Sequence, residues 1–218
     1  TRCADVTGVQ TCALPISPVM EMQIEGLTHP VALKLELAQH TGSFKPRGAF
    51  NTLLSSDVPE GGIVAASGGN HGAAVAYAAN RLGHKARIYV PEIAGPSKIA
   101  LIERAGADLV VVEGKYFDAL EAARAYEAET GAIQIHAYDL NTTVAGQGTV
   151  MLEWEEQGLE ADTVLIAVGG GGLIGGAIAW VNGRRQVVAI EPEECPSLHD
   201  ALKAGKPVET KAGGIAAN

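Results

Sequence analysis

The stretch TVLIAVGGGGLIGGAIAW, residues 163–180, begins with aliphatic residues, continues through four consecutive glycines, and ends in small apolar residues. The first part predicts a buried strand over 163–168, and the last part predicts a helix over 173–182. Four glycines let successive backbone N–H groups converge on one anion in front of the helix N-terminus, so a phosphate is the expected occupant. A purely structural turn is the alternative, but four glycines would then cost conformational entropy for no structural gain.

The same alternation of apolar runs and alanine-rich stretches extends from Val31 to the end of the chain. Strands are expected at 31–37, 63–66, 86–90, 108–113, 132–136, 163–168 and 186–191, and helices at about 72–82, 97–105, 116–129, 147–157, 173–182 and 197–204. Pro96 stands where a helix begins and Gly106 where one ends. Strands that are apolar throughout and separated by helices predict an α/β fold with parallel sheets covered on both faces.

Composition restricts the class of protein. The 218 residues are 47% hydrophobic and 19% charged, which is ordinary for a globular protein and argues against disorder. A net charge of -9 disfavours a nucleic-acid or anionic-membrane partner, and no apolar run approaches the roughly 20 residues that span a bilayer. Three cysteines, Cys3, Cys12 and Cys195, have neither a disulfide nor a metal-binding spacing, so no metal is expected and a reducing cytoplasm is predicted.

The N-terminus has a different character from the rest. VTGVQTCALPI, residues 6–16, looks like a translated sequencing adaptor. We therefore expect residues 1–16 to be a non-native leader and the protein to begin at about Ser17. An unusual native leader is the alternative.

A second motif, SFKPRGA at 43–49, follows the strand that contains Lys34 and Glu36. Lys45 lies beside an aromatic residue at a strand-to-helix junction, where its amine could form a Schiff base with an aldehyde cofactor if the surroundings keep it partly neutral. Phe44 could shape the pocket wall, and Gly48 permits close backbone packing. The residues alone also allow an ordinary surface lysine.

The third motif, SGGNHGAA at 67–74, lies at the C-terminal end of a predicted strand and the start of a helix. Ligands of open α/β sheets bind at such strand ends. Ser67, Asn70 and the free N–H groups of the turn offer donors to a carboxylate. The alternative is a Ser/Asn cap on an ordinary helix.

The glycine stretch also allows a dinucleotide-binding unit. Gly170, Gly172 and Gly175 satisfy G-x-G-x-x-G between a strand and a helix, and Glu191 ends the next strand, where an acid that binds ribose is expected. The other two motifs have no role in dinucleotide binding and argue against an oxidoreductase of this kind.

Together, SFKPRGA, SGGNHG and GGGGL, in this order and at these spacings, resemble the fold-type II pyridoxal-phosphate enzymes, most closely the threonine and serine dehydratases and the related serine racemases. The resemblance covers about residues 17–218. It implies the tryptophan synthase β-like fold, with a larger lobe (17–61 and 147–218), a smaller inserted lobe (62–146) and the cofactor between them. Because related enzymes continue beyond the match, we expect the C-terminal part of the larger lobe to be missing and the full-length protein to be a homodimer.

The resemblance also assigns roles to residues. Lys45 matches the Schiff-base lysine, Phe44 the residue beside the cofactor ring, and Asn70 the partner of the 3′-oxygen of pyridoxal 5′-phosphate. The phosphate cradle would consist of Gly169, Gly170, Gly171, Gly172 and Leu173. The substrate carboxylate would be bound by Ser67, Gly68, Asn70 and His71, with the backbone of His71 mattering more than its side chain.

The implied activity is β-elimination of a 3-hydroxy amino acid such as L-threonine or L-serine to a 2-oxo acid and ammonia. Three departures bear on it. Leu140 stands where relatives often carry an acidic residue, and Ser197 stands where metal-binding relatives carry an acid near the residue that matches Glu191. Racemases of the family carry serine at Gly68, so elimination rather than racemisation is expected. A catalytically silent fragment is the remaining alternative.

Overall fold

The computed structural model describes residues 14–210 and 213–214. Most of the predicted leader, residues 1–13, lies outside the described residues. Of its last three residues, Leu14 is buried in the core that contains Phe50, and the side-chain amide of Gln39 donates a hydrogen bond to the carbonyl of Pro15 at 2.9 Å. The start of the protein at Ser17 stays a prediction.

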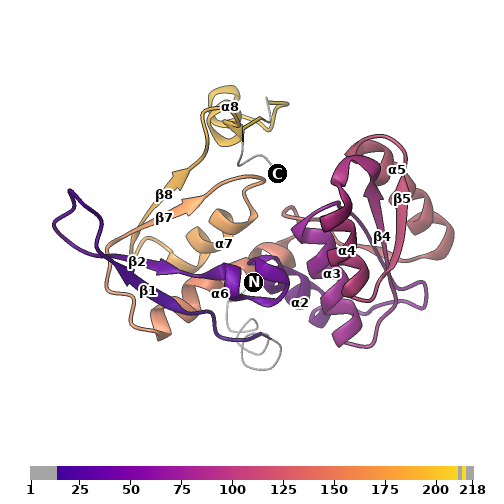
Figure 1. The fold of residues 1–218 in the computed structure, drawn as a ribbon, viewed down its shortest axis with the longest axis horizontal. Helices are drawn as coiled ribbons and strands as arrows, with labels where there is room; N and C mark the ends of the chain where they lie inside the picture. The colour runs from indigo at the N-terminus through magenta and orange to yellow at the C-terminus, as the bar shows by residue number, and fades with distance from the viewer. Residues whose placement is uncertain (1–13, 211–212, 215–218) are drawn as a thin grey trace.

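The α/β architecture expected from the sequence is confirmed, and Figure 1 shows its arrangement. The elements are β1 (Val19–Met22), β2 (Val31–Lys34), η2 (Glu36–Ala38), η3 (His40–Gly42), α2 (Lys45–Leu54), β3 (Ile63–Ala66), α3 (Asn70–Arg81), β4 (Ala86–Pro91), η4 (Glu92–Ala94), α4 (Pro96–Arg104), β5 (Asp108–Val112), α5 (Tyr116–Thr130), β6 (Ile133–Gln134), α6 (Asn141–Glu156), β7 (Thr163–Ala167), α7 (Gly172–Val181), β8 (Gln186–Ile190) and α8 (Ser197–Ala204). Within the described residues, no helix is long and apolar enough to span a membrane.

One body of the molecule is a four-stranded parallel sheet in the order β5-β4-β3-β6. The side chains of β3 alternate between its faces. Ile63 and Ala65 belong to the core under α3 and α4, whereas Val64 and Ala66 belong to the core under α5. The helices therefore cover both faces, as expected for strands that are apolar throughout.

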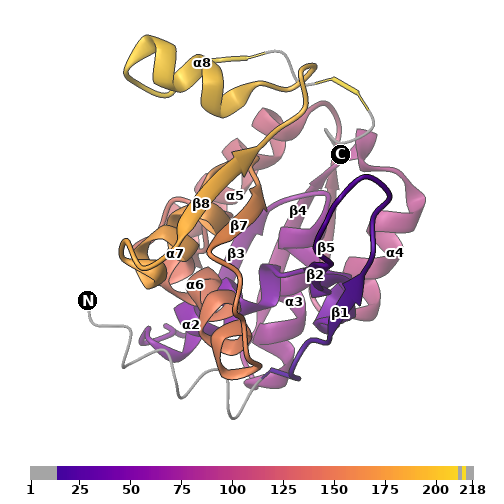
Figure 2. The ribbon, with the colours of Figure 1, turned by 90° about the vertical axis from the view of Figure 1, so that its left-hand side faces the viewer.

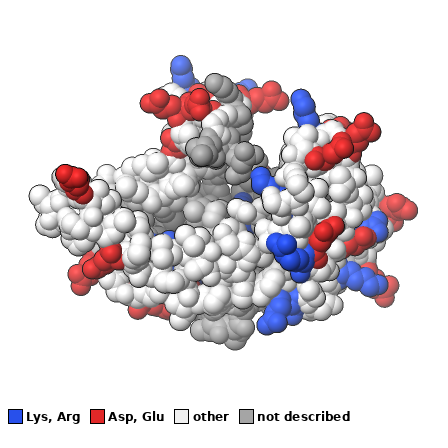
Figure 3. All heavy atoms as spheres, viewed as in Figure 1, with Lys and Arg blue, Asp and Glu red and all other residues white. Residues whose placement is uncertain are grey.

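The second body contains the parallel pair β7-β8, with α7 and α6 beside it (Figure 1). Val164 and Ile166 of β7 are buried against α7, and Leu165, on the opposite face, is exposed. Figure 2 shows α8 lying beyond the C-terminal end of β8. On the face drawn in Figure 3, charged side chains of both signs gather over the right-hand part and at the top, and much of the left-hand and central part is uncharged.

The prediction that 31–37 joins a parallel sheet was wrong. Only Val31–Lys34 is a strand, and it pairs antiparallel with β1 in the register Val19↔Lys34. The connection over 23–30 is short enough to return the chain beside itself, and a parallel pair would need a longer crossover. Residues 36–38 form the 3₁₀ turn η2 instead of extending the strand.

Helix α6 begins at Asn141 rather than at the expected 147, because packing outweighs the low helix propensity of its glycines. A Cβ on Gly146 would lie 2.7 Å from the Cα of Gly48 in α2, and a Cβ on Gly148 would lie 2.8 Å from the carbonyl oxygen of Gly176 in α7. These glycines let α6 pack directly against the backbones of both neighbouring helices.

Candidate active site

Lys45 is the first residue of α2. It follows β2 and the two 3₁₀ turns η2 and η3 along the chain. Its Nζ donates a hydrogen bond to the carbonyl oxygen of Ala137 at 2.9 Å and lies 5.2 Å from the centre of the Phe44 ring. Burial lowers the pKa of the Lys45 amine to about 8. An appreciable fraction of this amine is therefore uncharged near neutral pH, as a nucleophile or a proton acceptor requires.

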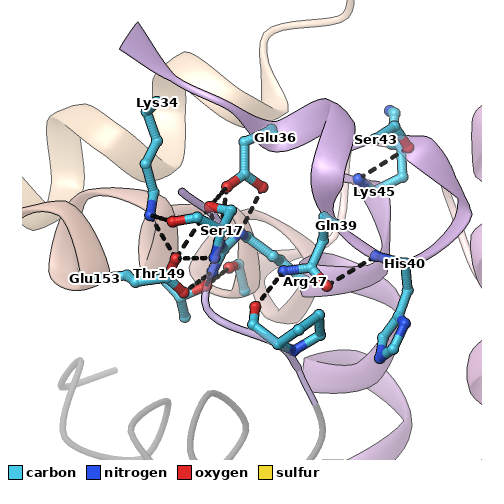
Figure 4. Close-up of polar contacts among 12 residues, drawn as sticks. Ser17, Lys34, Glu36, Gln39, His40, Ser43, Lys45, Arg47, Thr149 and Glu153 are labelled. Carbon is cyan, nitrogen blue, oxygen red and sulfur yellow. Dashed lines mark hydrogen bonds and ion pairs between the residues drawn. The ribbon is translucent and has the colours of Figure 1, made fainter. Parts of the chain in front are cut away.

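A buried ion network fixes the first turn of α2 (Figure 4). The guanidinium of Arg47 donates two hydrogen bonds of 2.7 Å to the carboxylate of Glu36, and it also contacts Glu153 at 3.1 Å and Thr149 at 3.2 Å. Lys34 pairs with the same Glu153 carboxylate. Burial alone would raise the pKa of Glu153, but hydrogen bonds from Arg47 and Lys34 outweigh it and hold that pKa below its ordinary value.

The SGGNHG motif forms the turn between β3 and α3, as predicted. The Ser67 hydroxyl accepts a hydrogen bond from the backbone N–H of Gly69 at 3.2 Å, and Asn70 begins the helix with an exposed side chain. His71 is buried, and its Nε2 lies 2.8 Å from the carbonyl oxygen of Ile135. A carbonyl only accepts, so Nε2 carries the hydrogen. Burial lowers the pKa of His71 to about 4, and the ring is neutral at physiological pH.

The four glycines form the predicted turn between β7 and α7. Gly171 has a φ of +86°, a left-handed conformation that favours glycine, and it caps α7. The Ser197 hydroxyl donates a hydrogen bond to the carbonyl oxygen of Gly169 at 3.1 Å. The first N–H groups of a helix have no intrahelical acceptor, so those of Gly172 and Leu173 are available to an anion.

The segment 135–138, between β6 and α6, joins the three motifs. The carbonyl of Ile135 accepts from His71, the carbonyl of Ala137 accepts from Lys45, and the ring of Tyr138 lies against the glycine turn. The sequence motifs did not reveal this segment. The signal that could have revealed it was its position. The segment spans the end of the predicted strand 132–136, at the same sheet edge as SGGNHG, where ligands of α/β sheets bind.

Two further predicted residues, Phe44 and Leu173, line a cavity of about 870 Å³. Its wall is mostly apolar, and β2, β7 and α6 contribute many of its residues. Lys45, the SGGNHG turn and the four glycines do not line it, so this cavity lies beside the polar part of the site.

The dinucleotide alternative places Glu191 on a ribose, and the structure gives this side chain another role. Its carboxylate accepts hydrogen bonds from the backbone N–H groups of Leu198 at 2.7 Å and His199 at 2.8 Å, at the start of α8. These bonds account for an acidic residue at the end of β8 without a ribose or a metal.

The geometry defines a class of protein: an α/β enzyme with a partly neutral lysine amine beside an aromatic ring, and a glycine turn at a helix N-terminus able to hold a phosphate. These groups fit a cofactor that carries both an aldehyde and a phosphate. The chain belongs to the pyridoxal-phosphate dependent enzyme family, whose model matches residues 15–218.

Individual relatives support this assignment. The chain is 41% identical over 204 residues to an L-threonine ammonia-lyase of Thermotoga maritima (91% of this chain, 50% of the relative) and 38% identical over 184 residues to a phenylserine dehydratase of Ralstonia pickettii (82% and 56%). The structure of maize serine racemase superposes with a TM-score of 0.89 at 30% identity, covering 97% of this chain and 67% of the racemase. The chain thus spans about half the length of the curated relatives it matches. The fold-type II assignment and pyridoxal phosphate as the family's cofactor are confirmed.

Proposed function

We propose that the complete protein catalyses the pyridoxal-phosphate-dependent β-elimination of a 3-hydroxy amino acid such as L-threonine or L-serine, giving a 2-oxo acid and ammonia. The observation that carries the proposal is the amine of Lys45, with its pKa lowered to about 8, in one site with the glycine turn. The names of the ammonia-lyase and dehydratase relatives support the same reaction.

The residues of this chain would divide the work. Lys45 would hold the cofactor and then accept the Cα proton, because its burial leaves the amine partly unprotonated. Residues 169–173 would bind the phosphate through backbone N–H groups. The turn 67–71 would bind the substrate carboxylate at the N-terminus of α3, where the neutral His71 keeps its hydrogen bond to the backbone. When bound, the cofactor supplies the electron sink for the carbanion.

The division into lobes remains part of this proposal. The four-stranded sheet and its helices fall within 62–146, and the β7-β8 pair and α8 fall within 147–218, which supports a smaller lobe inserted into a larger one. The roles of Asn70 and Gly68, the homodimer and the cytoplasmic location also stay proposals, drawn from the family resemblance and the composition.

Cofactor attachment is tested on residues 1–218. The chain is incubated with pyridoxal phosphate, reduced with borohydride and digested, and the labelled peptide is identified by mass spectrometry. We expect the label on Lys45. Label confined to other lysines would contradict the site.

Elimination is tested in a chimera, in which residues 17–218 replace the matching half of the Thermotoga maritima enzyme. Release of 2-oxo acid from threonine, serine and phenylserine would support the proposal and rank the substrates. A chimera that binds the cofactor and releases no 2-oxo acid from any of them would refute it.

A further inference from the structure

The four glycines of the turn are not equivalent. A Cβ on Gly170 would lie 2.5 Å from Cγ of Tyr138, and a Cβ on Gly172 would lie 2.9 Å from Cβ of Tyr138, both closer than real Cβ atoms approach. At Gly169 and Gly171 an added Cβ would meet no described atom within 4 Å. Two of the glycines therefore leave room for the tyrosine, and Gly171 provides the left-handed turn.

Tyr138 is held in place by its own loop. The Nδ1 of His136 accepts hydrogen bonds from the backbone N–H groups of Tyr138 at 3.4 Å and Asp139 at 3.1 Å. The His136 and Tyr138 rings pack edge to face, with centroids 4.7 Å apart and an interplanar angle of 85°. The adjacent carbonyl of Ala137 accepts from Lys45, so the same loop contacts both the amine and the glycine turn.

We propose that Tyr138 is a positioning residue for the phosphate. Its ring lies against Gly170, while its Cβ and backbone lie against Gly172. The ring contact holds the turn in the conformation in which its N–H groups face one anion. Four consecutive glycines have more backbone freedom than any other four residues, and they lose this freedom when the turn binds the phosphate. The ring removes part of that freedom before the cofactor arrives. This inference rests on the proposed function, because it takes the phosphate of pyridoxal phosphate as the anion.

Binding to residues 1–218 tests the proposal, with absorbance titration of pyridoxal phosphate and of pyridoxal, which lacks the phosphate. Freeing one residue of the turn is expected to weaken binding about tenfold. Tyr138→Ala should therefore weaken the binding of pyridoxal phosphate by about this factor and leave the binding of pyridoxal nearly unchanged. Tyr138→Phe keeps the ring and should bind like the wild type. Tyr126→Ala, a tyrosine that packs under Arg87 outside the site, is the matched control.

A second arm tests the contact itself. Gly170→Ala should strongly weaken the binding of pyridoxal phosphate. Adding Tyr138→Ala should relieve the collision, so the double variant should bind pyridoxal phosphate more tightly than the sum of the two single losses predicts. Gly175→Ala is the control, because its Cβ would make an ordinary contact of 3.6 Å with Val144. Circular dichroism and the melting temperature of each unliganded variant show that it is folded.

The outcomes separate the two proposals. Wild-type affinity in Tyr138→Ala, or strictly additive losses in the double variant, would overturn the role of the ring and leave the proposed function standing. Equal losses in Tyr138→Phe and Tyr138→Ala would assign the effect to the hydroxyl and also overturn it. A wild-type chain that binds pyridoxal and its phosphate equally well would refute the phosphate site, and with it both proposals.

Discussion

Arg47→Met should be the most destabilising single change in the polar interior. The guanidinium is fully buried, and its loss removes the ion-pair partner of Glu36 and leaves the Glu153 carboxylate with Lys34 as its remaining ion-pair partner. Removing one partner of a buried ion pair costs about 3–5 kcal/mol. For a chain of this size, that loss lowers the melting temperature by roughly 10 °C.

The assay is thermal and urea unfolding of residues 1–218, compared with Arg87→Met. Arg87 pairs with Asp108 on the surface, where its side chain is 35% exposed, and such pairs contribute about 0.2–1 kcal/mol. The Arg47→Met/Glu36→Gln double variant should recover part of the loss, because Arg47 is the only ion-pair partner of Glu36 among the described residues. Equal destabilisation by Arg47→Met and Arg87→Met would refute the reasoning.

The stability that the Arg47–Glu153 pair contributes depends on pH in a definite direction. The pKa of Glu153 in the folded protein lies below its ordinary value of 4.5, so its contribution to stability is present above pH 4.5 and is lost as the pH falls through the folded value. The difference in unfolding free energy between wild type and Arg47→Met should therefore shrink in acid. A difference that grows in acid would contradict the assigned charges.

The remaining predictions concern the site. Lys45→Ala should abolish both the attachment of cofactor by borohydride reduction and the elimination activity of the chimera, with little change in circular dichroism. Cofactor still attached to the variant would place the Schiff base on another lysine. Labelling of Lys45 in the wild type should rise with pH and level off above about pH 8, the value set by burial, and a continued rise toward pH 10.5 would show an ordinary lysine. Gly171→Val should greatly weaken the binding of pyridoxal phosphate while secondary structure is retained, because a β-branched residue rarely adopts the φ of +86° found at Gly171. Unchanged affinity would place the phosphate site elsewhere. In the chimera, L-serine should be eliminated rather than racemised, and rapid D-serine formation would contradict this. Gly68→Ser should cost about 1–3 kcal/mol of stability, because its Cβ would collide with Ala94, and an added Ala94→Gly should restore it.

The parts of the fold that sequence reasoning predicted depend on local patterns. The strand over Ile63–Ala66 and the helix over Ser197–Ala204 have the predicted bounds, because apolar runs and amphipathic spacing are local properties. Lys45 and the glycine turn were also placed correctly at element ends, since each lies where one pattern stops and another begins.

The parts that sequence reasoning missed depend on partners distant in the chain. The hairpin of β1 and β2 was missed because VMEM, the sequence of β1, has only one β-branched residue and its pairing with β2 is not a local property. The burial of Arg47 was missed because it requires Glu36 and Glu153, which lie 11 and 106 residues away. Tyr138 was missed because its role depends on glycines more than thirty positions further along the chain.

Helix α6 affects the distance between the two ends of the site. Its two glycine contacts lie on helices that carry opposite ends of the site: α2 begins with Lys45, and α7 begins after the glycine turn. The distance from the amine to the phosphate cradle therefore depends in part on backbone-to-backbone contacts at Gly146 and Gly148. A single methyl group at either contact is expected to push the helices apart and lengthen that distance.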